Sequence, residues 1–320
     1  MSELGIIIGI VKAKVSTINW KRILLDKGVS AMFLTPALIL LLVLLVGPFS
    51  YMVGLSFTDL SFSQPDHDGN FVGFLNYRKL MRDDPIFWES FLTTIKFVFA
   101  SVGTEFLFGL GLALLLFNII KSQRVIVTLI LMPMMLAPVA IGLMWKLLLS
   151  GEFGMLTYYL RQIALMAPQT APLSSYKLVL WTMVAIDVWE WTPFVTLVIL
   201  AGLMSLPKEP FEAAIMDGAK PLRVFRDVTL PLLRPIIALV MLLRGIDAFK
   251  EFDKVFILTG GGPGSATELL SIYTWRINFR NWDFGYGSVV AFMVYLVVLI
   301  MCSIFYKAIT WKQGIEEIRT

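Results

Sequence analysis

Uncharged apolar stretches alternate with short charged ones along the chain. Residues 28–58, 125–145 and 284–306 contain no Asp, Glu, Lys or Arg and consist mainly of apolar side chains. A helix of about 20 apolar residues crosses the hydrocarbon core of a bilayer. These three stretches therefore predict three membrane-spanning helices.

Three further apolar stretches carry charges within them, and we expect these to span as well. They are residues 91–120 with Lys96 and Glu105, 177–204 with Asp187 and Glu190, and 235–258 with several charges. The segment 153–176 is interrupted by prolines and a polar run, which favours an interfacial helix and a loop. The pattern predicts an all-α polytopic membrane protein with six transmembrane helices.

Basic residues predict the orientation of these helices. The first span is too long for the core of a cleaved signal peptide, so we expect it to be retained. If the amino terminus is cytoplasmic, the inside segments hold 15 Lys and Arg and the outside segments 6, which favours both termini in the cytoplasm. The predicted parts are a cytoplasmic amino-terminal segment (1–30), a six-span domain (31–310) with outer loops at 58–90 and 259–283 and a cytoplasmic loop at 205–234, and a cytoplasmic tail (311–320).

Composition excludes soluble globular and disordered proteins. Of the 320 residues 58% are hydrophobic and 16% are charged, and the mean hydropathy is +0.78, so the surrounding medium is membrane lipid. One cysteine, Cys302, and one histidine, His67, give neither a disulfide framework nor a metal site. The net charge of +4 is explained by basic cytoplasmic loops, and we expect no nucleic-acid partner.

In the cytoplasmic loop 205–234, the positions of proline and glycine predict two short helices. Prolines precede a helix-forming stretch at 211–216, Gly218 can end it in the left-handed conformation, and Pro221 can open a second helix that we expect to stop near Pro231. Apolar residues suited to a partner's groove lie on one side: Phe211, Ile215, Met216, Leu222 and Phe225. On these grounds alone, a solvated connector remains an alternative.

This loop carries a family resemblance. Glu212, Ala213 and Ala214, followed by Asp217, Gly218 and Ala219 and then by Phe225, Val228, Leu230 and Pro231, resemble the EAA loop of binding-protein-dependent ABC importer permeases; Val228 stands where Ile is usual. The segments 258–268, 71–77 and 191–194 resemble the carbohydrate-uptake branch of that family, which includes maltose and glycerol-3-phosphate permeases. The resemblance covers roughly residues 30–310.

The resemblance implies the type I ABC importer permease fold and a set of partners. Residues that would couple to a cytoplasmic ATPase dimer are Glu212, Ala213, Ala214, Asp217, Gly218 and Phe225. ATP and Mg would be bound by that ATPase, since this chain has no phosphate-binding loop with its lysine, and the chain itself would not be an enzyme. The other implied partners are a second, homologous permease, a periplasmic or lipid-anchored substrate-binding protein and a saccharide. The implied location is the bacterial cytoplasmic (inner) membrane.

Charges inside the predicted fifth span need an explanation, because ions in a membrane are costly. Arg244, Asp247, Glu251 and Lys254 fall on one face of a continuous helix. Their charges cancel, and neighbours can pair as Arg244 with Asp247 and Glu251 with Lys254. The sequence thus predicts a polar stripe along a cavity wall, with salt bridges to the partner permease as the alternative.

By the same resemblance, the helices flanking the EAA loop hold the substrate. The matching positions are Glu190, Trp191, Phe194, Arg244, Asp247, Ala248 and Glu251. An aromatic ring beside acidic groups suits a sugar. Ions here indicate an acidic or strongly hydroxylated saccharide, whose carboxylate Arg244 would grip bidentately.

Two competing functions remain open on the residues alone. One is an ion-coupled secondary sugar carrier that uses the span-five charges as a relay. The other is a membrane glycosyltransferase or hydrolase that uses Asp187 or Asp247. Glu105, which lies near Gly103, Gly109 and Gly111, indicates close helix packing around an acid that is either pore-facing or paired.

Overall fold

The computed structural model describes residues 20–317 apart from 65, 118–122, 164, 166, 168 and 169. Predictions for 1–19 and 318–320 lie outside the described residues. The chain forms two compact units, Met1–Leu55 and Ser56–Thr320. In the first, α2 (Trp20–Leu55) is one helix with Pro36 and Pro48 inside it. Its portion Met32–Leu55 is long and apolar enough to cross a membrane, as predicted for the first span.

The second unit is built from helices. They are α3 (Leu75–Arg82), α4 (Pro85–Phe117), α5 (Gln123–Leu131), η1 (Pro133–Met135), α6 (Pro138–Leu148), α7 (Met155–Gln162), α8 (Val179–Ser205), α9 (Glu209–Met216), α10 (Pro221–Val224), η2 (Phe225–Thr229), α11 (Leu230–Phe249), α12 (Asp253–Leu258), α13 (Leu270–Trp275), η3 (Arg276–Arg280) and α14 (Phe284–Glu317). Extended pairing in the described residues is limited to two isolated bridges. The all-α prediction is confirmed.

Five stretches of the described chain are long and apolar enough to span a membrane: Met32–Leu55, Pro85–Phe117, Val179–Ser205, Pro221–Leu258 and Phe284–Lys307. The chain is therefore a multi-pass membrane protein, but the count of six and the orientation of the termini stay predictions.

The third predicted span, 125–145, is wrong as a continuous helix. It is divided into α5, η1 and α6, because two prolines interrupt it. Leu136 and Ala137 are extended, with ψ of 146° and 136°, and the residue before Pro138 is sterically disfavoured from the helical region.

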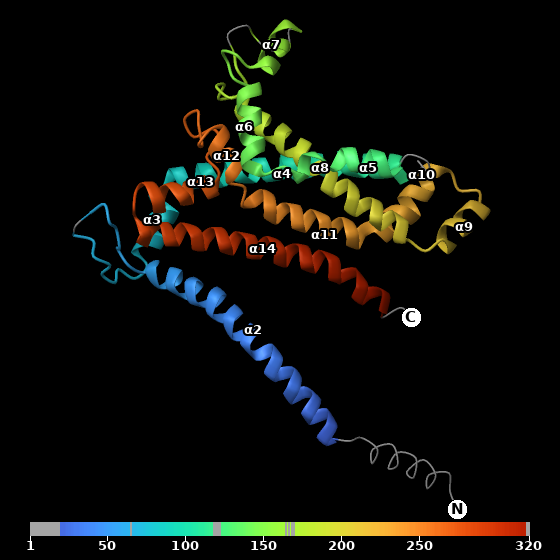
Figure 1. Ribbon diagram of the computed structural model, residues 1–320, viewed down its shortest axis with the longest axis horizontal. Coiled ribbons are helices and arrows are strands. Elements are labelled where there is room, and N and C mark those ends of the chain that lie inside the picture. The colour runs from blue at the N-terminus through green and yellow to red at the C-terminus, as the bar shows by residue number, and fades with distance from the viewer. Residues whose placement is uncertain are drawn as a thin grey trace, which may run out of the picture. The chain divides into compact units, whose positions relative to one another are not determined.

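The core forms where α11 packs against α4 and α8 on one side and α14 on another (Figure 1). α4 comes close to α8 at Gly109, where an added Cβ would lie 2.6 Å from Cγ1 of Val195. The predicted close packing holds at Gly109, whereas an added Cβ at Gly103 or Gly111 meets nothing within 4 Å. Gly109 thus allows α4 and α8 to meet.

The predicted end of the second cytoplasmic helix near Pro231 is wrong. The chain passes from α10 through η2 into α11 without leaving the helical path. In η2 the bonds widen to the π pattern, and the Leu230 backbone N–H donates to the Phe225 carbonyl. This widening accommodates the missing donor of Pro231 at the first turn of α11.

The fifth predicted span is also divided. α11 ends at Phe249, residues 251 and 252 are non-helical, and α12 begins at Asp253. The helix axis is therefore not continuous from Arg244 to Lys254, and side chains on either side of the break need not share a face.

The two predicted outer loops meet at one end of the helices. Ser61 pairs with Asp283 in a short bridge, and Tyr273 and Tyr286 both donate hydrogen bonds to the Asp84 carboxylate. In Figure 1, α9 and α10 lie at the opposite end of α11 from α3 and α13. The predicted outer loops and the cytoplasmic loop thus occupy opposite ends of the second unit.

An ion pair with a buried carboxylate lies within the outer loop 259–283. Arg276 Nη1 lies 2.9 Å from Oε1 of Glu268, whose side chain is buried. Burial raises the pKa of the Glu268 carboxyl, and Arg276 opposes that shift. Gly260, Gly261 and Gly264 of the same loop have positive φ, which other residues rarely adopt.

Candidate functional site

The loop between α8 and α11 forms the two helical segments that the sequence predicts. α9 begins after a proline-bounded turn and carries Glu209 and Glu212 in its first turn, where acids favour the helix dipole. It ends at Met216, and Gly218, two residues later, has a φ of +70°. The Gly218 N–H donates to the Ile215 carbonyl and the Ala219 N–H to that of Ala214, which is a Schellman cap.

The loop 205–234 exposes apolar side chains. Met216 is 87% exposed, and Ile215 and Leu222 are also exposed, whereas Phe211 and Phe225 are half-buried. No residue of α9 is buried. Exposed apolar residues on a short, capped helix fit the groove of a partner protein.

A hollow separates α9 from the membrane helices. Its volume is about 560 Å³ and its lining comes from the ends of α4 and α8 and from α9 itself. Glu212 lies on its rim and is exposed. With this hollow behind it and no buried side chain of its own, α9 packs only loosely against the membrane helices.

Charged side chains gather in the middle of the helix packing. This charge cluster consists of Glu105 from α4, Asp187 and Glu190 from α8, Arg244 from α11, Glu251 from the break, and Lys254 from α12. Apart from Glu251, with 13% side-chain exposure, the members are almost fully buried. Four carboxylates thus surround two cations.

Arg244 joins α11 to α4 and α8. Its Nε and Nη2 donate to the two carboxylate oxygens of Glu105 at 2.7 and 2.8 Å, and Nη2 also donates to Asp187 at 3.1 Å. The first pair is a bidentate fork, the strongest geometry open to a guanidinium. The Arg244 side chain is only 1% exposed.

Lys254 joins α12 to α8. Its Nζ lies 2.5 Å from Asp187, 2.6 Å from Glu190 and 3.2 Å from Glu251. Removing one partner of such a buried pair costs about 3–5 kcal/mol, because an uncompensated charge remains. Asp187 bonds both cations and is the centre of the cluster.

The charge cluster lies between two apolar clusters along three helices. On α4, Glu105 falls between Val102 of one apolar cluster and Ala113 of the other, and Arg244 on α11 falls between Val240 and Ala248. Asp187 and Glu190 likewise lie between Ile186 and Val195. The charges therefore form a polar layer across the interior.

These contacts correct the predicted pairing. Arg244 does not pair with Asp247, which instead lies 2.9 Å from Lys250; the predicted pair of Glu251 with Lys254 is confirmed. The four stripe residues do not pair only with one another, because acids from α4 and α8 contact both of its cations. Of the two roles left open for Glu105, the structure gives the paired one.

The predicted substrate residues divide by exposure. Glu190, Arg244 and Ala248 are buried. Trp191, Phe194 and Asp247 are half-buried, and the Glu251 side chain is only 13% exposed. Trp191 and Phe194 form an edge-on aromatic pair with centroids 6.1 Å apart. In this structure Arg244 is enclosed by two acids, so it offers no surface to a substrate carboxylate.

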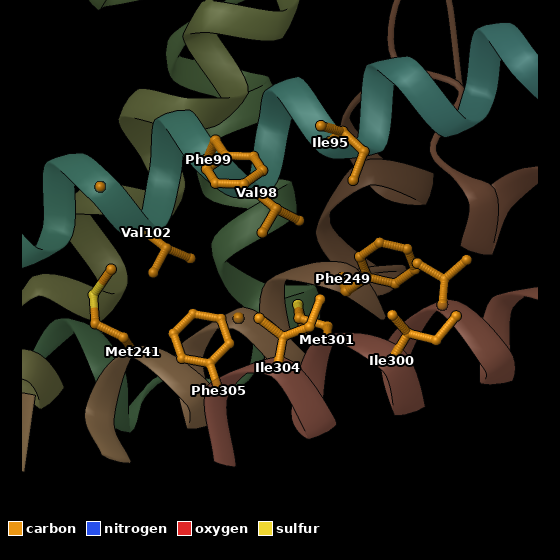
Figure 2. Close-up of a pocket in the computed structure, with 13 residues that line it drawn as sticks. Ile95, Val98, Phe99, Val102, Met241, Phe249, Ile300, Met301, Ile304 and Phe305 are labelled. Carbon is orange, nitrogen blue, oxygen red and sulfur yellow. The ribbon is translucent and has the colours of Figure 1, made fainter. Parts of the chain in front are cut away.

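An apolar pocket opens elsewhere, between α4, α11 and α14 (Figure 2). Val98, Phe99, Met241, Phe249 and Phe305 are among its lining residues, all of them apolar or glycine. A sugar needs hydrogen-bonding groups, and this lining supplies no polar side chain. The pocket is therefore not the saccharide site.

Comparison with known proteins identifies the family of sequences that this chain resembles. The family described as the inner membrane component of binding-protein-dependent transport systems matches residues 105–310. A probable ABC transporter permease from Sinorhizobium fredii is 34% identical over 90% of this chain and 88% of its own length.

Two other relatives have names that include a substrate. The trehalose/maltose transport system permease of Thermococcus litoralis is 34% identical over 74% of this chain and 79% of its own. The sulfoquinovosyl glycerol transport system permease of Agrobacterium fabrum is 32% identical over 90% of this chain and 92% of its own.

Solved structures show the same fold. A chain of a bacterial ABC transporter involved in the import of the acidic polysaccharide alginate is 22% identical, with 91% of this chain and 98% of that chain covered and a TM-score of 0.75. A chain of a bacterial alginate ABC transporter in complex with an alginate-pentasaccharide-bound periplasmic protein gives a TM-score of 0.73 at 21% identity, with 90% of this chain and 95% of that chain covered.

Proposed function

Because this chain belongs to the family of binding-protein-dependent transport system inner membrane components, we propose that it forms one half of the membrane pathway of an ATP-driven saccharide importer. Like its relatives, the chain is a permease subunit, and it is not an enzyme. The proposed mechanism is alternating access, in which closure of a separate ATPase dimer moves α9 and opens the pathway outward.

The observation that carries the proposal is α9, a capped helix whose apolar side chains are exposed to solvent. The motif residues Glu212, Ala213 and Ala214 lie in α9, Asp217 and Gly218 follow it, and none of the five is buried. Because the hollow behind α9 leaves it lightly supported, a partner that holds its apolar side can move it. Phe225, half-buried in η2, would pass that movement to α11.

The partners follow from the same mechanism. A second, homologous permease would complete the pathway, and a cytoplasmic ATPase dimer would bind ATP and Mg and dock on α9. A periplasmic or lipid-anchored substrate-binding protein would deliver the saccharide to the end where the outer loops meet. The proposed location is the bacterial cytoplasmic membrane.

The proposed substrate is a sugar or oligosaccharide, since relatives are named for trehalose and maltose and for sulfoquinovosyl glycerol. Support comes from the half-buried pair Trp191 and Phe194, because an aromatic ring stacks on the apolar face of a sugar. An acidic saccharide is the finer proposal. Lys250, with a side chain 68% exposed beside Asp247, is the cation available to it.

Gly218 offers a direct test of coupling. An added Cβ would meet nothing within 4 Å, so a substitution acts only through its φ of +70°. Valine disfavours that conformation by about 1–2 kcal/mol, whereas asparagine tolerates it. We expect Gly218→Val to reduce maltose-stimulated or uronide-stimulated ATPase activity of the reconstituted complex about tenfold.

Gly218→Asn is the matched control and should retain near-native activity. Pull-down of the ATPase subunit checks that both variants still assemble. Native coupling in Gly218→Val would contradict the assignment of α9 as the element that receives the force.

A further inference from the structure

Trp191 has no hydrogen bond of its own to fix its ring. Its Nε1 is buried and donates to no partner among the described residues. The orientation of the indole therefore depends on what lies against its faces and edges. Its ring neighbours are Phe194, edge-on at 6.1 Å, and the Arg244 guanidinium, whose Cζ lies 4.6 Å from the ring centroid.

Arg244 is itself held in one plane. The bidentate fork to Glu105 and the third bond to Asp187 fix a planar group along its edges and leave its faces for stacking. A cation over an indole face is attracted by the ring quadrupole, most strongly where water is excluded. The orientation of the guanidinium therefore determines that of the indole.

Arg244 does not reach a substrate in this structure, because its side chain is 1% exposed. Trp191 is the more exposed member of the pair. Any influence of Arg244 on a saccharide therefore passes through the aromatic ring. Glu105 acts on the indole through Arg244, since its carboxylate orients the guanidinium.

We propose that Glu105 and Arg244 are positioning residues that fix the Trp191 indole as a stacking platform for the transported saccharide. The inference rests on the proposed function, because it takes Trp191 to line the saccharide pathway. Glu105 then contributes to substrate affinity. Arg244 acts indirectly, through the indole, and does not bind a substrate carboxylate itself.

Two substitutions disturb the platform in different ways. Glu105→Gln keeps the shape of the side chain but loses the charged fork, and Arg244→Lys keeps the charge but loses the planar face. Lys254→Arg is the matched control, because it keeps a cation on Asp187 and Glu190 and no ring contact links Lys254 to Trp191 among the described residues.

The readouts are transport kinetics and the environment of Trp191 in the full transporter with its partner subunits in nanodiscs. Maltose and trigalacturonate, each loaded on the binding protein, are the substrates. The resonance of Trp191 is followed by fluorine NMR after 5-fluorotryptophan labelling and is assigned by its loss in Trp191→Phe. We expect Glu105→Gln and Arg244→Lys to shift that resonance and to raise the KM roughly tenfold with kcat retained. Lys254→Arg should leave both the resonance and KM unchanged.

An unshifted Trp191 resonance in Glu105→Gln, or a shift with native KM, would overturn the positioning role. If Arg244→Lys does not assemble, the isosteric Glu105→Gln decides alone. Equal effects in Lys254→Arg would reduce the cluster to a structural role. A native KM in Trp191→Ala would instead contradict the proposed place of Trp191 in the saccharide pathway, while the resonance shifts would still report the contact.

Discussion

Each charged side chain in the interior of this permease has a partner supplied by another helix or by the next turn. Glu105 and Asp187 enclose Arg244, and Asp187 and Glu190 enclose Lys254. Because an unpaired ion in a membrane interior is costly, these pairings explain why the charges can be buried. Because both cations of the cluster are enclosed by acids, a cation outside the cluster would have to recognise an acidic substrate. Lys250 is an exposed cation outside the cluster.

Lys250→Gln should therefore weaken transport of acidic saccharides selectively. An exposed ion pair contributes about 0.2–1 kcal/mol, so we expect the KM for trigalacturonate to rise about twofold to fivefold and that for maltose to stay constant. Lys220→Gln, in the exposed turn before α10, is the control. Equal changes for both sugars would exclude Lys250 from charge recognition.

At the scale of elements, local chemistry predicts some features and tertiary contacts decide others. Proline and glycine positions predict α9 and its end at Gly218, because cap chemistry is local. The path through Pro231 depends on the π turn η2, which no periodicity indicates. The break after Phe249 likewise changes which charges meet.

Charge balance could have located the cluster from the sequence. Glu105, Asp187 and Glu190 all lie in stretches expected to span, and buried acids require cations. Arg244 and Lys254 are the cations that meet them. Which acid meets which cation could not be predicted, because that depends on the approach of α4 and α8 to α11.

That approach makes Gly109 and Gly103 a matched pair on α4. A Cβ at Gly109 would lie 2.8 Å from Cβ of Val195 and 3.2 Å from the Thr196 nitrogen, atoms that cannot move freely. We expect Gly109→Ala to lower the free energy of unfolding by about 1–3 kcal/mol, measured as a loss of thermal stability of the purified complex.

Gly103→Ala should be neutral or stabilising by up to about 1 kcal/mol, because nothing lies within 4 Å and alanine favours a helix. If both variants melted alike, the close contact between α4 and α8 would not determine stability.

At the scale of the whole molecule, the second unit has two functional ends joined by a polar layer. The outer loops meet through Asp84 and Tyr273, and α9 lies at the other end (Figure 1). The charge cluster joins α4, α8, α11 and α12 between these ends. In the proposed mechanism, ATP-driven displacement of α9 would pass along α11 to this interior and move the saccharide.

Uptake by sealed vesicles tests this claim most directly. The complete transporter is reconstituted with saccharide-loaded binding protein outside and ATP inside, and accumulation of labelled maltose or trigalacturonate is followed with and without ionophores. We expect accumulation that requires ATP, survives collapse of the ion gradients and is lost in Gly218→Val but not in Gly218→Asn. Accumulation that continues without ATP and stops when the ion gradients collapse would contradict an ATP-driven mechanism.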